Sequence, residues 1–284
     1  MVAIKPSYMD SSLKNLVMAL AVLITAYGFI IFSGPCDQVV WRSRGAGTFV
    51  ITKLKFEAYM INQSEQNNTI ACGPENAEKC IIWLHGLGAS GSDLAEGVWP
   101  AFPLAMRQGW RAIFPNAPQQ RVTINNGAVM PAWFDLYSIS DRSKEDEVGL
   151  ANSAQMLKEI ITTQIELGIE PSKIVVAGFS QGGAIALYSL LQLDIKLGAV
   201  ISLSAYVPMA GLNNLSSNPN NLSTAIMLMH GEYDDIVPYN ALADAEARLK
   251  GLGYKPQSKS YAMAHEMCPS QAHDLMSFLQ AAIK

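Results

Sequence analysis

Positively charged side chains are scarce in this 284-residue sequence, and so are cysteine and histidine. Only 15% of the residues are charged, the formal net charge is −4 and the isoelectric point is about 5.6. Domains that bind nucleic acid usually carry a strongly basic surface, so this composition argues against a nucleic-acid partner. No internal repeat is visible, and the length suits one large globular domain with an additional segment at one end.

Cysteine occurs only four times, at Cys36, Cys72, Cys80 and Cys268. Cys72 and Cys80 flank a short polar segment, GPENAEK. In an oxidising compartment these two residues could form a disulfide that closes a small loop, whereas in a reducing compartment they would be ordinary thiols. The pattern leaves both possibilities open.

A long uncharged run stands out near the N-terminus. The 22 residues between Lys14 and Asp37 carry no charge, and their apolar core, 16–32, is 17 residues long. That length is at the lower limit for crossing a bilayer. No small-x-small cleavage site stands out, and Pro35 is unfavourable for cleavage nearby.

We therefore expect residues 1–36 to form a signal anchor or a signal peptide that contains one apolar helix, followed by a globular domain over 37–284. The anchor is favoured, with residues 16–32 in the membrane and the domain on the extracytoplasmic side. The alternatives are a cleaved signal, which would give a secreted or periplasmic protein, and a buried apolar helix docked on the domain.

Beyond residue 45, short apolar runs alternate with segments of helical periodicity. Alternation of this kind predicts a mostly parallel sheet with helices on both faces, in which ligands bind beyond the carboxyl ends of the strands. The expected strands are 56–61, 80–86, 111–118, 173–177, 198–206, 225–231 and 259–264. The expected helices are 148–167, 181–193, 240–250 and 269–283.

One strand passes directly into a helix in the stretch VVAGFSQGGAIALYSLL, residues 175–191. Such a sharp corner forces Ser180 into a strained backbone conformation, and its neighbours need little side-chain bulk. Gly178 and Gly182 supply that space, in the G-x-S-x-G pattern of a nucleophile on a tight turn. The alternative is a tight turn with an ordinary serine, so Ser180 needs partners elsewhere in the sequence.

A serine hydroxyl needs a base to take its proton and an acid to orient that base. On α/β-hydrolase folds the chain order is serine, then acid, then histidine. Of the four histidines only His265 and His273 follow a plausible acid. His265 comes directly after the last predicted strand and is the expected base, while His273 is expected on the face of the closing helix.

The segment MHGEYDDIVP, 229–238, offers Glu232, Asp234 and Asp235 as the acid, and composition alone leaves the choice open. The oxyanion formed during the reaction needs two backbone donors. One is expected from Gln181, after the serine, and the other from Leu87 in the glycine-rich segment LHGLGASGSD, 84–93.

These pieces together resemble the phospholipase/carboxylesterase family of α/β-hydrolases, which includes bacterial carboxylesterases and acyl-protein thioesterases. The resemblance covers about residues 50–284 and leaves the N-terminal apolar segment outside. The matching pieces are WLHGLGASGSD, FPNAPQQRVTINNGAVMPAWFDLY, AGFSQGGAIALYSL, LSAYVP, MHGEYDDIVP and AHEMCPSQ.

The resemblance implies that Ser180 is the nucleophile, Asp234 the acid and His265 the base, with Leu87 and Gln181 as the oxyanion donors. It implies no cofactor and no metal. The expected function is a serine carboxylic-ester hydrolase that forms an acyl-enzyme with a small-molecule, lipid or acylated-protein ester or thioester.

The same resemblance places Trp133 along the acyl groove. Asp135, in the same piece, is expected to organise its own loop, and Asp235 stands where the family often has proline. His85 and His230 are expected to order their loops through hydrogen bonds. The alternative functions are a lysophospholipase at the membrane surface, a catalytically silent binding protein and a peptidase, for which no added lid domain is visible.

Overall fold

A computed structural model describes residues 30–31, 38–42, 48–52, 69–139, 141, 143–209 and 219–283 of the chain. Contacts between Cα atoms divide the chain into two compact units, residues 1–61 and 62–284. The boundary expected between residues 36 and 37 stays a prediction.

The first unit contains a three-stranded antiparallel sheet of β1 (Ile30–Ile31), β2 (Gln38–Arg42) and β3 (Thr48–Thr52). Ile30 and Ile31 therefore form a strand where the apolar helix over 16–32 was expected, and the rest of that segment lies outside the described residues. The strand expected at 56–61 lies outside them too. Among the helices in the described part of the chain, none is long and apolar enough to cross a membrane.

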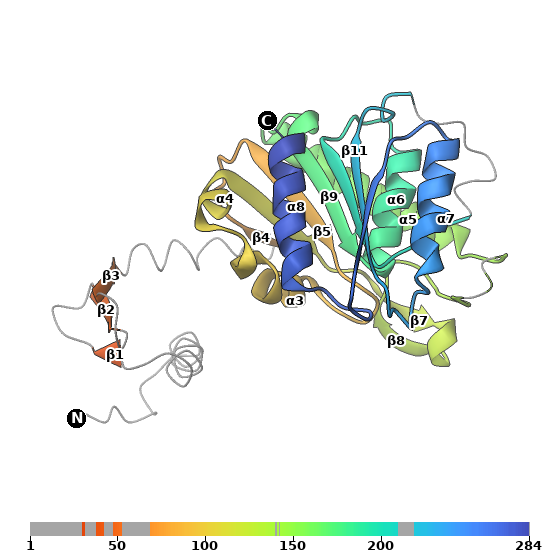
Figure 1. Ribbon diagram of the computed structural model, residues 1–284, viewed down its shortest axis with the longest axis horizontal. Coiled ribbons are helices and arrows are strands. Elements are labelled where there is room, and N and C mark those ends of the chain that lie inside the picture. Colours follow the sequence, from red (N-terminus) through yellow and green to blue (C-terminus); the bar gives the residue numbers. More distant parts are fainter. Residues whose placement is uncertain are drawn as a thin grey trace. The chain divides into compact units, whose positions relative to one another are not determined.

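The second unit is built on a seven-stranded sheet with the order β12-β11-β10-β9-β5-β6-β4 (Figure 1). All neighbouring strands are parallel except β4, which runs antiparallel at the edge. The prediction of a mostly parallel sheet is confirmed. The strands are β4 (Thr69–Cys72), β5 (Lys79–Leu84), β6 (Trp110–Pro115), β9 (Ile174–Phe179), β10 (Ala199–Leu203), β11 (Ala225–Gly231) and β12 (Gln257–Tyr261).

Helices cover both faces of this sheet, as expected for an α/β-hydrolase fold. Buried residues of α5 (Glu147–Glu166), α6 (Gln181–Gln192) and α7 (Asn240–Gly251) share one core cluster. Those of α3 (Gly91–Gly97), the short 3₁₀ helix η2 (Trp99–Ala101) and α8 (Pro269–Ala282) share the other. A short helix, α4 (Leu104–Gly109), leads into β6.

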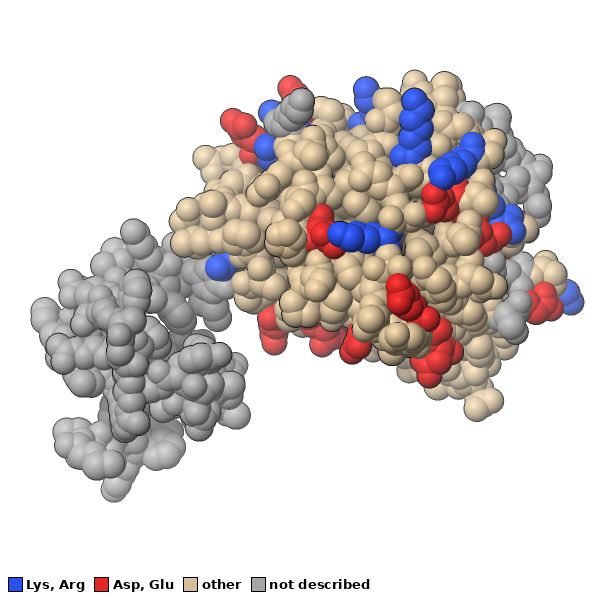
Figure 2. All heavy atoms as spheres, viewed as in Figure 1, with Lys and Arg blue, Asp and Glu red and all other residues tan. Residues whose placement is uncertain are grey.

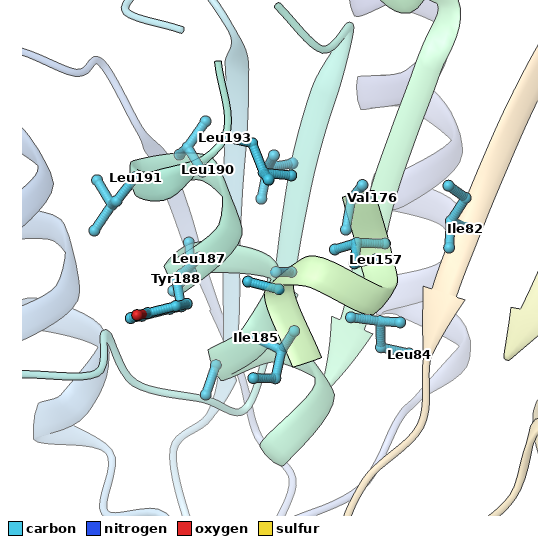
Figure 3. Close-up of a cluster of buried hydrophobic side chains, with 14 of the residues drawn as sticks. Ile82, Leu84, Leu157, Val176, Ile185, Leu187, Tyr188, Leu190, Leu191 and Leu193 are labelled. Atoms are coloured by element: carbon cyan, nitrogen blue, oxygen red, sulfur yellow. The ribbon is translucent and has the colours of Figure 1, made fainter. Parts of the chain in front are cut away.

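The alternation of side chains along the strands fills both clusters. On β5, Ile82 and Leu84 face α6, whereas Ile81 and Trp83 face the opposite side. Figure 3 shows Ile82, Leu84 and Leu157 converging with the side chains of α6. Burying one such side chain contributes roughly 1.5–3 kcal/mol, so this packing fixes α6 firmly against the sheet.

The strand order keeps Cys72 and Cys80 apart. Cys72 on β4 pairs with Ala112 of β6, and Cys80 on β5 pairs with Arg111 of the same strand. Because neighbouring strands lie about 4.8 Å apart, two strands that flank a third are about 10 Å apart, beyond the roughly 7 Å that a disulfide spans. Cys72 and Cys80 therefore do not form the disulfide that the sequence left open. Burial raises the pKa of the Cys80 thiol.

A small hairpin of β7 (Gln119–Val122) and β8 (Ala128–Pro131) follows β6 and was not expected from the sequence. Its turn contains the 3₁₀ helix η3 (Thr123–Asn125) and ends at Asn126 and Gly127, which both have positive φ. Asp135 accepts hydrogen bonds from the amide and the hydroxyl of Thr123, at 2.7 and 2.6 Å. Its expected role as an organiser of this loop is confirmed.

Candidate active site

Ser180 stands alone between the last residue of β9 and the first residue of α6. Its backbone has φ 53° and ψ −120°, a region that costs of order 1–3 kcal/mol for a residue other than glycine. The Ser180 amide donates to the Leu203 carbonyl at 2.8 Å, and the Ser180 carbonyl accepts from the Ala184 amide at 3.0 Å. These bonds to β10 and α6 hold the strained corner in place.

The glycines on either side of Ser180 allow three backbones to meet. A Cβ atom on Gly178 would clash with the backbone of Gly182, and a Cβ on Gly182 would clash with the carbonyl oxygens of Leu84 and His85. The first glycine therefore lets α6 approach β9, and the second lets it approach β5. This close approach fixes the position of the Ser180 side chain relative to the loop that follows β5.

Three side chains that are far apart in the sequence form one chain of hydrogen bonds at this corner. Nε2 of His265 lies 2.9 Å from Oγ of Ser180, and Nδ1 of the same ring lies 2.8 Å from Oδ2 of Asp234. Because a carboxylate only accepts, Nδ1 carries the ring proton and Nε2 is left to accept from the serine hydroxyl. This is the protonation pattern in which an imidazole can act as a base.

The structure separates the three acids that the sequence left as candidates. Asp234 is buried, and its Oδ1 accepts from the amides of Ile236 and Val237 at 3.0 and 2.8 Å. Glu232 is exposed and accepts from the Ser260 hydroxyl instead. Asp235 is also exposed, so Asp234 is the acid that faces His265.

The two residues expected to supply the oxyanion donors, Leu87 and Gln181, line the same cavity as Ser180. Gln181 is the first residue of α6, and Leu87 lies in the loop between β5 and α3. The Gln181 amide belongs to the first turn of α6, where backbone N–H groups have no partner within the helix. The Gly88 amide donates to the Pro131 carbonyl at 2.8 Å, which ties the Leu87 loop to the hairpin.

Trp133 supports this loop from behind and does not line the cavity. Its side chain is 2% exposed, and its indole N–H donates to the His85 carbonyl at 2.8 Å. The amide of Trp133 donates to Oε1 of Gln181, whose Nε2 donates to the Phe134 carbonyl. The expectation that Trp133 lies along the acyl groove is therefore corrected, because these bonds turn the ring into the core.

Gln181 thus has a second role that the sequence reasoning missed. Its side chain holds the segment that contains Trp133 and Phe134. The available signal was a glutamine directly after the serine, at the start of an apolar helix. An amide side chain that is buried there needs hydrogen-bond partners.

Two buried histidines order the loops on either side of the site, as expected. Nδ1 of His85 donates to the Gly86 carbonyl at 2.7 Å, and its Nε2 accepts from the Ala117 amide at 3.0 Å. Nε2 of His230 lies 2.9 Å from the Val237 carbonyl. Burial lowers the pKa of both rings below the ordinary value, so both are neutral at pH 7. His273 is exposed on α8 and lies away from this set of bonds.

A cavity of about 1260 Å³ opens at Ser180 and His265. One side of it, between α3–η2 and α8, is enclosed by buried side chains that include Leu94, Phe102 and Leu275. The other side, next to the hairpin, has walls that are partly open to solvent, such as Ile124 and Ile236. Within the described ranges, no three histidine, cysteine or acidic side chains are placed to hold a metal ion.

The sequence of residues 65–283 matches the model of the phospholipase/carboxylesterase family. The chain belongs to this family. It is 34% identical to acyl-protein thioesterase 1 of Saccharomyces cerevisiae over 224 residues, which cover 75% of this chain and 97% of the yeast protein. It is also 34% identical to acyl-protein thioesterase 1 of Candida albicans, over 76% of this chain and 96% of that relative.

Among solved structures, Arabidopsis thaliana SOBER1 superposes with a TM-score of 0.68 at 31% identity. The match covers 73% of this chain and all of the Arabidopsis chain. The family and its α/β-hydrolase fold make this chain a serine hydrolase of the carboxylic ester and thioester class.

Proposed function

We propose that the protein is an acyl thioesterase and carboxylesterase whose reaction runs through an acyl-enzyme on Ser180. The observation that carries the proposal is the unbroken series of hydrogen bonds from Ser180 through His265 to Asp234. A serine, a base and an orienting acid in this geometry are what nucleophilic acyl transfer requires.

In the first half of the reaction Oγ of Ser180 attacks the acyl carbon while Nε2 of His265 takes the hydroxyl proton. The amides of Leu87 and Gln181 donate to the resulting oxyanion. When the tetrahedral intermediate collapses, the bond to the leaving thiol or alcohol breaks and His265 returns the proton to it. Asp234 stabilises the imidazolium while it exists.

In the second half water attacks the acyl carbon of the Ser180 ester. His265 takes a proton from the water and then returns it to Oγ as the carboxylic acid leaves. The net reaction consumes one water and yields the acid and the free thiol or alcohol.

We further propose that the natural substrate is an acylated protein or a similar thioester. Two observations support this proposal: the 34% identity to two acyl-protein thioesterases, and the enclosed apolar side of the cavity, which suits an alkyl chain. Figure 2 shows acidic side chains along the lower edge of the unit, where α3 and α8 begin in Figure 1. Their negative potential disfavours an anionic lipid surface as the substrate.

The first experiment tests the chemistry by labelling with a fluorophosphonate probe, which reacts with activated serine hydroxyls. Wild type is expected to label and Ser180→Ala is expected not to, with a loss of turnover of about 10⁴-fold or more. Equal labelling of the two proteins would remove Ser180 as the nucleophile and would favour a catalytically silent binding protein.

The second experiment compares substrates by measuring kcat/KM for a palmitoyl-peptide thioester, short p-nitrophenyl esters and lysophosphatidylcholine. The thioester is expected to be the best of the three. A clear preference for lysophosphatidylcholine would replace the proposal with a lysophospholipase.

The N-terminal segment leads to a separate proposal on location. We propose that residues 16–32 anchor the protein in a membrane, with the catalytic domain on the extracytoplasmic side. The support is the uncharged run between Lys14 and Asp37. Protease digestion of intact cells should remove an epitope placed at Lys284, and protection of that epitope would contradict this orientation.

A further inference from the structure

A second histidine contacts the carboxylate that orients His265. His230 is in β11, is 1% exposed, and places Nε2 3.3 Å from Oδ2 of Asp234. That oxygen is the one that accepts from Nδ1 of His265. The two imidazoles therefore meet one carboxylate oxygen from two elements, β11 and the loop after β12.

The proton of His230 can be placed from its neighbours. Nε2 faces the Val237 carbonyl at 2.9 Å and Oδ2 of Asp234 at 3.3 Å, and both are acceptors. Nε2 therefore carries the proton and shares it between the two oxygens. Burial is the main cause that lowers the pKa of His230, with a smaller effect in the same direction from His265, while Val237 and Asp234 oppose it. The ring is a neutral donor at pH 7.

We propose that His230 is a positioning residue for the reaction, whose Nε2–H holds Oδ2 of Asp234 and withdraws part of its charge from His265. This inference rests on the proposed function, because it concerns how His265 is held in its role as the base. A neutral histidine suits this task since it donates one hydrogen bond without adding a buried charge.

A hydrogen bond from His230 to Asp234 should affect how the rate depends on pH. His265 contacts Asp234 on one side and Ser180 on the other, and its ring lies 4.8 Å from the Phe179 ring. A donor that shares Oδ2 weakens the pull of Asp234 on a protonated His265. Removing that donor should therefore move the acid limb of the pH–rate profile to higher pH.

The experiment compares two replacements of His230 that differ in what they keep. His230→Phe keeps an aromatic ring and loses the donor, whereas His230→Gln loses the ring and keeps an N–H group at a similar distance from the backbone. The readout is the acid limb of kcat/KM against pH for a p-nitrophenyl ester. In His230→Phe this limb is expected to move up by about 0.5–1 pH unit, and in His230→Gln it is expected to stay near wild type.

Two other histidines provide matched controls. His85→Gln is expected to lower turnover through the oxyanion loop without moving the acid limb, because His85 bonds only main-chain groups. His273→Gln removes an exposed imidazole that lines the cavity and lies next to Asp274, and it is expected to leave the limb in place. If His230→Phe fails to fold by circular dichroism, His230→Asn takes its place, since its shorter side chain withdraws the donor from Oδ2.

The outcomes separate this inference from the proposed function. An acid limb that stays at its wild-type pH in the donor-free variant, with only a lower rate, would overturn the inference and leave His230 a structural residue. Equal shifts in His230→Phe and His230→Gln would also overturn it, because the donor would then not matter. Failure of the proposed function would instead appear as undiminished probe labelling of Ser180→Ala.

Discussion

The molecule contains two His-Gly pairs in closely similar settings, and they behave differently. His85-Gly86 follows β5 and begins the loop that contains Leu87, while His230-Gly231 ends β11 and begins the loop that contains Asp234. Both rings are buried, and burial lowers the pKa of both. Yet His85 bonds only main-chain groups, whereas His230 also contacts a carboxylate.

The glycines of the two pairs differ as well. A Cβ atom on Gly231 would clash with the carbonyl oxygens of Met263 and Ala264, the two residues before His265. A Cβ on Gly86 would meet mainly the Phe179 ring, at 3.2 Å. Rigid backbone therefore lies against Gly231, whereas a side chain that can move lies against Gly86. The comparison indicates that the loop after Gly231 tolerates less change than the loop after Gly86.

The largest expected effect concerns the acid itself. In Asp234→Asn the side-chain oxygen can still accept from Ile236 and Val237, but an NH₂ group then meets the Nδ1–H of His265. The ring is driven to the wrong tautomer, and kcat should fall about 10⁴-fold with little loss of fold. Steady-state kinetics with thermal unfolding as the control would check this, and a loss below tenfold would show that Asp234 is not the orienting acid.

The next prediction compares alanine substitutions of Gly231 and Gly86. Gly231→Ala should displace the His265 loop and lower kcat/KM about 100-fold, a loss that a 1 Å misplacement can cause. Gly86→Ala requires only a small movement of Phe179 and should cost less than about tenfold by the same reasoning. If the two variants lose equal activity, the proposed difference between the loops is wrong.

A smaller effect should appear in the dependence of stability on pH. The folded-state pKa of His85 and of His230 lies below the unfolded value of about 6.5. Their contribution is therefore fully present above pH 6.5, and it is lost as the pH falls because the unfolded state then binds more protons.

The slope can reach about 1.4 kcal/mol per pH unit for each histidine. Urea unfolding between pH 8 and 5 should show this loss, and His85→Gln and His230→Gln should each flatten the curve. A variant that retains the full wild-type slope would show that its histidine is not buried in the neutral form.

The smallest effect is expected one residue away from the largest. Asp235→Asn removes an exposed carboxylate beside Asp234 and should change kcat/KM by less than about twofold. Kinetics at low and high salt would check this. A loss comparable to that of Asp234→Asn would mean that the loop presents a different acid from the one found here.

Much of the site could be predicted from the sequence because the determining patterns are local. The strand, the two glycines and the helix around Ser180 lie within a few residues, and the scarcity of histidine leaves His265 as the clear base. The choice of Asp234 over Glu232 and Asp235 depends on how a turn is oriented in three dimensions. Composition contains no information on that, and only the resemblance to a family made the assignment.

The errors have physical causes of the same kind. The edge strand β4 is only four residues long, too short for a periodic pattern. Whether Cys72 pairs with Cys80 was left open because they are close in sequence, and it is decided by β6, which lies between their strands. Trp133 belongs to a segment assigned to the acyl groove, and only the bond from its indole to His85 shows that the ring turns inward.

The insertion of β6 between β4 and β5 also bears on where this enzyme can mature. Since backbone pairing holds Cys72 and Cys80 on separate strands, the sheet of the second unit forms without a disulfide between them and needs no oxidant for that bond. Folding of this sheet should therefore proceed alike in the reducing interior of a cell and in an oxidising space outside it. A change of compartment would leave its strand order unaffected.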